Sequence, residues 1–125
     1  MELATFLLFP TAAYLVGSFP SAYILTRLLR RVDIREVGTG NTGASNVFLS
    51  VGNVSGLIVL FFDSLVKGFL PTLLFVWLDI PIWTLLLSSL SLVAGHNWSV
   101  FLKFKGGRGV ATSIGVLLGV GMWWQ

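Results

Sequence analysis

Four apolar runs, separated by short polar segments, constrain this chain more than any other feature. The runs cover about residues 3–29, 54–78, 82–94 and 110–124. A membrane-spanning helix needs about 20 mostly apolar residues, and in lipid only helices and closed barrels satisfy every backbone polar group. The pattern therefore predicts an all-α, polytopic membrane protein with about four transmembrane helices.

Composition supports the same class. The chain has 125 residues, of which 55% are hydrophobic and only 10% are charged, whereas a soluble domain carries about 25% charged residues. Cysteine is absent from the sequence, so disulfides and thiolate metal sites are excluded. Since the sequence has one histidine and five carboxylates, we expect no dedicated metal site.

Breaks within the runs refine the helix boundaries. The first run contains Pro10, Pro20 and the pair Gly17-Ser18, which predict one kinked transmembrane helix. The third run can extend through Trp98 to Leu102. The fourth run is shorter than the roughly 20 residues of a typical span, and starting its helix at Gly106 would give the missing length.

The distribution of cations predicts the orientation. All lysines and arginines except Lys67 lie in or beside two polar loops, about residues 30–53 and 95–109, which two crossings separate. Both loops therefore belong on one side, which the positive-inside rule makes the cytoplasm. The N-terminus is then outside, where the aromatic residues Trp77, Trp83, Trp123 and Trp124 would mark the interface.

The first polar loop has the composition of an anion-binding site. It reads Val-Gly-Thr-Gly-Asn-Thr-Gly-Ala-Ser-Asn-Val over residues 37–47. Glycines let backbone N–H groups converge on one point, and a following helix N-terminus adds its dipole. A phosphate site and a flexible turn between two helices both remain open at this stage.

The second loop strengthens the case for an anion. Residues 95–112 combine the single histidine, His96, with the cations Lys103, Lys105 and Arg108 and with Gly106, Gly107 and Gly109. Arginine grips phosphate through two parallel hydrogen bonds, and lysine acts as a point charge. A purely topological role explains Lys103, but it does not explain the glycines beside Lys105 and Arg108.

Three further ionisable residues are candidates. His96 is open to three roles: an acid or base, a phosphate ligand, or a helix-end cap. Asp63 and Lys67 lie four residues apart in the second apolar run. Ionisable residues within a membrane are functional candidates by default, but this spacing also allows the two to neutralise each other.

Taken together, these motifs resemble those of the bacterial acyl-phosphate:glycerol-3-phosphate acyltransferases of the PlsY type. Residues 37–46 are similar to the family's first motif, Gly-Ser-Gly-Asn-x-Gly-Ala-Thr-Asn. Residues 95–112 are similar to its second motif, which ends Phe-Lys-Gly-Gly-Lys-Gly-Val-Ala-Thr. The stretch from Asp63 to Gly68 resembles the family's Asp-x-x-Lys-Gly. The likeness covers nearly the whole chain.

The resemblance implies a multi-pass enzyme of the cell inner membrane that acts in phospholipid synthesis. Such an acyltransferase moves a fatty acyl group from acyl phosphate to the 1-hydroxyl of glycerol 3-phosphate, giving lysophosphatidic acid and phosphate. No cofactor, metal or nucleic acid is expected. The resemblance implies catalytic roles for Arg108, Lys105 and His96. The phosphate-binding residues would be Thr39, Gly40, Asn41, Gly43, Asn46, Gly106 and Gly107.

Several positions depart from the family pattern. Thr39 stands where serine is usual, Ser99 where proline is usual, Arg108 where lysine is usual, and Leu49 where an arginine is common. The family is also longer, with a third motif that has no match here. We therefore expect residues 1–125 to form a single membrane domain that is the N-terminal part of a longer fold. The chain would be either a fragment of such an enzyme or a shortened homologue that must self-associate to complete its site.

Two other functions remain open from the sequence. One is a non-catalytic membrane fragment that binds anionic lipid or phosphate, and the other is an anion carrier. A carrier predicts polar residues that continue across the membrane, and apart from Asp63 and Lys67 the apolar runs contain few.

Overall fold

The structure is a computed structural model that describes residues 2–124, and every regular element in this range is a helix. In chain order the elements are α1 (Leu3–Ser18), α2 (Ser21–Arg30), η1 (Ile34–Glu36), α3 (Ala44–Ser50), α4 (Asn53–Phe61), the π-helix η2 (Phe62–Phe69), α5 (Leu70–Trp77), α6 (Ile82–Asn97), η3 (Val100–Leu102), α7 (Val110–Gly121) and η4 (Met122–Trp124).

The lengths of these helices confirm the predicted class. Within the described residues, three continuous helical segments are long and apolar enough to cross a membrane: Leu3–Arg30, Asn53–Trp77 and Ile82–Leu102. Val110–Gly121 is apolar but shorter. The chain is therefore an all-α membrane protein that crosses the bilayer more than once.

The first span is kinked, as predicted, and the kink lies at Phe19-Pro20. Helix α1 continues through Pro10, whereas α1 ends at Ser18 and α2 begins at Ser21. Proline has no backbone N–H, and its ring restricts the residue before it to extended conformations. The Phe19 carbonyl is thereby released from the regular helical pattern, and it accepts a hydrogen bond from Lys67 Nζ at 2.9 Å.

The fourth helix does not begin at Gly106, so that expectation is wrong. Residues 105–109 are irregular, and α7 starts at Val110 after Gly109, whose φ is +75°. A left-handed glycine at this position turns the chain into the helix. The glycine-rich segment is therefore a loop that is free to line a site.

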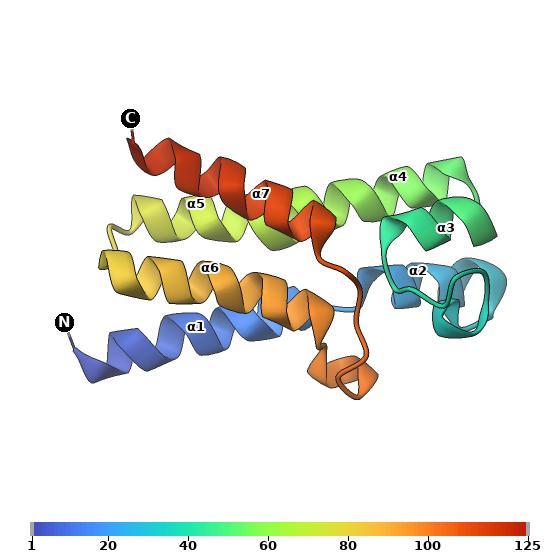
Figure 1. The fold of residues 1–125 in the computed structure, drawn as a ribbon, viewed down its shortest axis with the longest axis horizontal. Helices are drawn as coiled ribbons and strands as arrows, with labels where there is room; N and C mark the ends of the chain where they lie inside the picture. The colour runs from blue at the N-terminus through green and yellow to red at the C-terminus, as the bar shows by residue number, and fades with distance from the viewer. Residues whose placement is uncertain (1, 125) are drawn as a thin grey trace.

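The helices pair along their lengths (Figure 1): α1 lies against α6, and α7 lies against η2 and α5. The termini and the turn between α5 and α6 lie at one end of the molecule, and both motif loops lie away from that end. The prediction that two crossings bring the motif loops to the same side is confirmed. Which side faces the cytoplasm stays a prediction.

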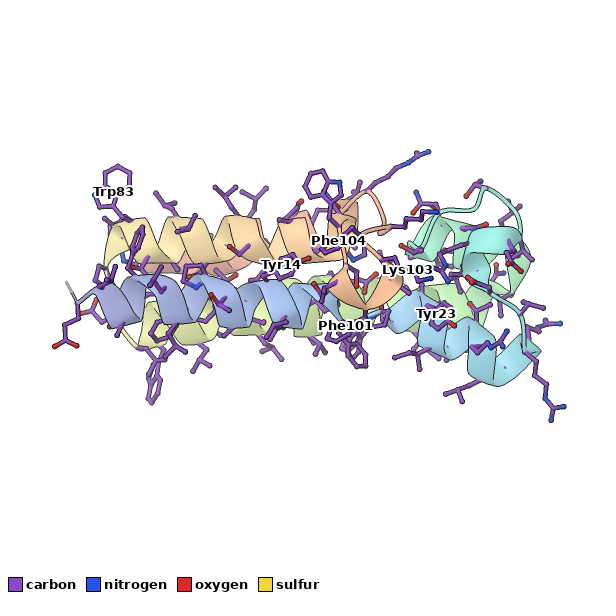
Figure 2. The ribbon with its side chains drawn as sticks, turned by 90° about the horizontal axis from the view of Figure 1, so that it is seen from below. Tyr14, Tyr23, Trp83, Phe101, Lys103 and Phe104 are labelled. Carbon is purple, nitrogen blue, oxygen red and sulfur yellow. The ribbon has the colours of Figure 1, made fainter. Side chains whose placement is uncertain are left out.

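Exposed aromatic side chains lie at one end of the molecule and near its middle (Figure 2). Trp83, which is exposed, lies at the end that holds the N-terminus, whereas Phe101, Lys103 and Phe104 lie together on the loop that follows α6. The Tyr14 hydroxyl donates a hydrogen bond of 2.6 Å to the carbonyl of Trp98, which ties the start of that loop to α1. The side chain of Trp124 lies outside the described part of the chain.

Glycines make the close helix pairs possible. A Cβ atom on Gly95 would lie 2.7 Å from the backbone nitrogen of Ser18, and one on Gly115 would lie 2.8 Å from the backbone nitrogen of Phe69. Neither distance is compatible with a side chain. Small residues at such crossings let the backbones of membrane helices approach closely.

Gly115→Ala is expected to destabilise the protein by about 1–3 kcal/mol, because the added methyl group would overpack the crossing of α7 and η2. The matched control is Gly121→Ala on the same helix, since a Cβ atom there meets nothing within 4 Å. Thermal unfolding in detergent measures both variants. Equal unfolding temperatures for the two would contradict the close packing of α7.

The first motif loop is more ordered than a flexible turn. A small core holds it against α2 and α4; the buried members of this core are Ala22, Ile34, Val47 and Val59. The loop also forms η1 and α3 within its length. The motif residues are therefore presented from a packed support.

Candidate functional site

Asn46 organises the first motif loop. Its side chain is fully buried, and its Nδ2 lies 2.9–3.1 Å from the carbonyl oxygens of Ile34, Val37 and Asn41. Its Oδ1 accepts hydrogen bonds from the Thr39 backbone N–H and the Ser50 hydroxyl, each at 3.0 Å. Because these contacts occupy both ends of the amide, Asn46 fixes the path of the loop.

The other predicted residues of this motif form tight turns above Asn46. The Asn41 Oδ1 accepts a hydrogen bond of 3.1 Å from the Gly43 N–H, and the Thr39 Oγ1 accepts one of 3.3 Å from the Asn41 N–H. Gly40 has a φ of +75°, which glycine adopts without strain. The turns place Asn41 and Gly43 toward the second motif.

The second motif loop packs on the end of α6. The Gly107 N–H donates a hydrogen bond of 3.1 Å to the His96 carbonyl. A Cβ atom on Gly106 would lie 2.5 Å from the backbone of Asn97, and a Cβ atom on Gly107 would lie 2.5 Å from His96 Nε2. These glycines are therefore required for the close approach of the loop to His96.

The two motifs meet in a pocket of about 320 Å³, named here the inner pocket. Its polar lining comes from Asn41, Gly43, Asp63, His96 and Arg108. Its remaining lining is mostly apolar or backbone: Ala44, Ser45, Phe48, Leu60, Gly109, Val110, Ala111 and Ile114. Residues far apart in the sequence therefore share one cavity, and the exposed Arg108 is its cation.

The N-terminus of α7 also opens into the inner pocket, since Val110 and Ala111 line it. The first hydrogen bond of this helix runs from the Ser113 N–H to the Gly109 carbonyl at 2.8 Å. The amide groups of the first turn of a helix have no acceptor within the helix, and the helix dipole favours an anion there. Arg108 and these amides thus supply positive potential to the same space.

Lys105 faces a different space, named here the outer pocket, of about 470 Å³. The lining residues of the outer pocket are Asp33, Arg35, Glu36, Gly40, Thr42, Lys103, Lys105 and Gly106. Lys105 and Arg108 are close in sequence, yet the loop directs them to separate pockets. Gly40 and Gly106 likewise line the outer pocket, whereas Thr39 is exposed and Gly107 lies next to His96.

A polar cluster of Ser21, Asp63, Lys67 and His96 lies beside the inner pocket, which Asp63 and His96 line; Asp63, Lys67 and His96 are buried, and Ser21 is half-buried. Lys67 Nζ lies 3.3 Å from Asp63 Oδ1 and 2.9 Å from His96 Nδ1. The Ser21 hydroxyl donates to Asp63 Oδ1 at 2.5 Å. Asp63 and Lys67 lie in η2, and π-helical segments are frequent at functional sites.

Part of this cluster could not be predicted from the sequence. The spacing of Asp63 and Lys67 allows an ion pair between them, which the structure contains. The contact between Lys67 and His96 joins residues 29 positions apart, and no local pattern indicates it. Ser21 follows Pro20 in a helix that otherwise gives no sign of chemistry.

An ion pair at the rim of the outer pocket responds to pH. The Asp33 carboxylate accepts hydrogen bonds from the Arg35 backbone N–H at 2.9 Å, from Nε at 3.0 Å and from Nη2 at 2.7 Å. The Arg35 guanidinium therefore lowers the pKa of Asp33 below its ordinary value. Arg35 also stacks over Tyr23, with its guanidinium carbon 5.3 Å from the ring centroid.

Asp33→Asn is expected to lower the stability of the protein by up to about 1 kcal/mol at neutral pH, because this pair is partly exposed. A carboxyl with a lowered folded-state pKa stabilises the fold above its unfolded pKa, about 3.9, and this effect is lost as the pH falls through the folded value. The gap in unfolding temperature between wild type and variant should therefore persist at pH 5 and close only below about pH 4. A gap that is already absent at pH 6 would contradict the pairing.

Comparison with known proteins gives a consistent result. The sequence matches the family of glycerol-3-phosphate acyltransferases over residues 7–125. It is 50% identical over 113 residues to glycerol-3-phosphate acyltransferase 4 of Dehalococcoides mccartyi (strain CBDB1), a match that covers 90% of this chain and 48% of that protein. It is 43% identical over 116 residues to the enzyme of Staphylococcus aureus (strain Newman), covering 86% of this chain and 57% of that protein.

The fold is shared with solved structures. The crystal structure of PlsY (YgiH), an integral membrane glycerol 3-phosphate acyltransferase, in its glycerol 3-phosphate form, superposes with a TM-score of 0.86 at 42% identity. That match covers 94% of this chain and 58% of the solved one. The chain spans about half the length of the curated relatives it matches. By sequence and by fold, the chain belongs to the glycerol-3-phosphate acyltransferase family.

Proposed function

We propose that this chain transfers a fatty acyl group from acyl phosphate to the 1-hydroxyl of glycerol 3-phosphate, at the cytoplasmic face of the cell inner membrane. The products are lysophosphatidic acid and inorganic phosphate. The observation that carries the proposal is the inner pocket, where both motifs meet beside Arg108 and the N-terminus of α7. The names of the relatives, all glycerol-3-phosphate acyltransferases, support the same reaction.

The lining of the inner pocket suits a phosphate attached to an acyl chain. Arg108 and the first amides of α7 hold the phosphate, since an arginine fork and a helix N-terminus both favour this anion. Asn41 contributes a side-chain amide from the first motif. Leu60 and Ile114 lie on the apolar side of the pocket, which suits the hydrocarbon of a lipid substrate.

Other motif residues act indirectly in this proposal. Asn46 has its amide engaged by the backbone, so it positions the loop. Thr39, which accepts from the Asn41 N–H, holds the turn that carries Asn41. Lys105 lies in the outer pocket with Lys103 and Arg35, where it attracts phosphate compounds toward the site.

Acyl phosphate is already activated for acyl transfer, so the protein does not need to form a covalent intermediate. The hydroxyl oxygen of glycerol 3-phosphate forms a bond to the acyl carbon, and the bond from that carbon to the phosphate oxygen breaks. The hydroxyl proton is transferred to the leaving phosphate, which is released as hydrogen phosphate. Correct placement of the two reactants and stabilisation of the charge that develops on the leaving phosphate supply the rate enhancement. Arg108 is the residue placed for the second task.

The test is made with the purified chain in lipid vesicles, supplied with palmitoyl phosphate and glycerol 3-phosphate. The proposal predicts equal amounts of lysophosphatidic acid and inorganic phosphate. Phosphate release without lysophosphatidic acid would point to hydrolysis, and retention of both substrates would point to a protein that only binds anions. Either result would refute the acyltransferase assignment. Self-association stays a prediction, which the mass of the solubilised protein checks.

A further inference from the structure

We infer that Lys67 is a positioning residue, which holds His96 in the tautomer that carries its proton on Nε2 and thereby presents an N–H donor to the inner pocket. The inference deepens the proposed function and depends on it only for the identity of the ligand. It starts from a contact between two buried residues, Lys67 Nζ and His96 Nδ1, at 2.9 Å.

The surroundings of Lys67 indicate a charged ammonium group. Asp63, which is 1% exposed, places Oδ1 at 3.3 Å from Nζ, and a carboxylate buried this deeply requires a positive partner. The Phe19 carbonyl accepts a second hydrogen bond at 2.9 Å. An ammonium group has three N–H donors, and the three neighbours Asp63, Phe19 and His96 match them.

The role of His96 Nδ1 follows from that of Lys67. An ammonium group donates and has no lone pair to accept with, so Nδ1 must be the acceptor and carries no proton. Asp63 Oδ2 does not offer an alternative, because it lies 3.9 Å from Nδ1, beyond hydrogen-bond distance. In a neutral imidazole the remaining proton is then on Nε2.

The opposite edge of the ring faces the two motifs. A Cβ atom on Gly107 would lie 2.5 Å from His96 Nε2 and 3.3 Å from Asn41 Oδ1, so Gly107 leaves that edge uncovered by a side chain. His96 lines the inner pocket together with Arg108 and Asn41. The Nε2–H group is therefore a neutral donor for a phosphate oxygen, and in this tautomer Nε2 cannot act as a general base.

The direct test is the nitrogen-15 NMR spectrum of the wild-type protein labelled at histidine, produced with an affinity tag free of histidine. His96 is the single histidine, so the spectrum contains one pair of ring nitrogens. The inference predicts a protonated Nε2 and an unprotonated Nδ1 at neutral pH. A proton on Nδ1, alone or together with one on Nε2, would overturn it.

Lys67→Met removes the donor and should leave His96 with a mixture of both tautomers. Because this variant leaves Asp63 unpaired, Asp63→Asn combined with Lys67→Met provides the same test without a lone buried charge. The control is Lys103→Met, which removes an exposed lysine near the same loop and should preserve the wild-type pattern. An unchanged tautomer in both Lys67 variants would overturn the role of Lys67.

Two substitutions of His96 test the direction of the donor. Glutamine can place an amide N–H near the position of Nε2, whereas asparagine can replace only the acceptor near Nδ1. The affinity for palmitoyl phosphate should fall about tenfold or more in His96→Asn, because a hydrogen bond to a charged group is lost, and it should fall clearly less in His96→Gln. Equal losses would overturn the donor role.

Together, the NMR and binding experiments distinguish a failure of this inference from a failure of the proposed function. The predicted tautomer in a protein that binds no palmitoyl phosphate would support the role of Lys67 and refute the ligand. Binding of palmitoyl phosphate by a protein with a proton on His96 Nδ1 would support the ligand and refute the role of Lys67.

Discussion

Arg108→Ala is expected to lower kcat/KM for acyl transfer by about 10- to 100-fold, because one or two charge-assisted hydrogen bonds to phosphate are lost. Arg108 is the cation that lines the inner pocket beside the N-terminus of α7. Arg108→Lys keeps the charge but loses the planar fork, so its loss should be intermediate. Phosphate release at varied concentrations of palmitoyl phosphate measures all of these variants.

Two comparisons make the Arg108 prediction specific. Lys105→Ala should cost less than Arg108→Ala, since Lys105 lies in the outer pocket and acts at a distance. Arg27→Ala removes an exposed arginine of α2 that lines neither pocket, and it should leave kcat/KM near the wild-type value. A larger loss from Lys105→Ala than from Arg108→Ala would contradict the assignment of the inner pocket.

Asp63→Ala is expected to destabilise the protein by about 3–5 kcal/mol, because it leaves the Lys67 ammonium buried without its counter-ion. The side chains of this pair are 3% and 1% exposed, so a lone ammonium group at this position would be poorly solvated. Thermal unfolding in detergent is the measurement. The double variant Asp63→Ala with Lys67→Met should recover much of the loss, since it removes both charges.

Asp33→Ala is the matched control for Asp63→Ala, because it also removes the carboxylate of an ion pair. Asp33 and Arg35 keep side-chain exposures of 15% and 29%, so the expected cost is only up to about 1 kcal/mol. Similar losses of stability in Asp33→Ala and Asp63→Ala would contradict the prediction, because they would show that burial of the Asp63–Lys67 pair does not increase the cost of removing its carboxylate.

The helices were predictable because lipid leaves the backbone few choices. Apolar runs near residues 3–29, 54–78 and 82–94 correspond to the three spans of the structure, and Pro20 accounts for the kink. The length of the apolar run did not predict where α7 begins. The helix starts at Val110 because Gly109 adopts a left-handed backbone conformation, which hydropathy does not indicate. The order within residues 30–53 depends on a small core that a glycine-rich sequence does not reveal.

The site was predictable in its residues and less so in its geometry. The motifs identify Asn41 and Arg108, which the structure brings to one pocket. The separation of Lys105 from Arg108 arises within the irregular segment of residues 105–109, whose backbone path residue types rarely indicate. The contact of Lys67 with His96 depends on how η2 packs against α6. Local sequence patterns do not predict how helices distant in the sequence pack against each other.

The central claim, that both motifs form one phosphate site, is tested most directly by a double-mutant cycle on the binding of palmitoyl phosphate. The four proteins are wild type, Asn41→Ala, Arg108→Ala and the double variant, with affinities measured by calorimetry in one detergent. Residues that share a ligand in one pocket should couple by at least about 0.5 kcal/mol. Strictly additive losses would contradict the claim, because they would show that Asn41 and Arg108 act at separate sites.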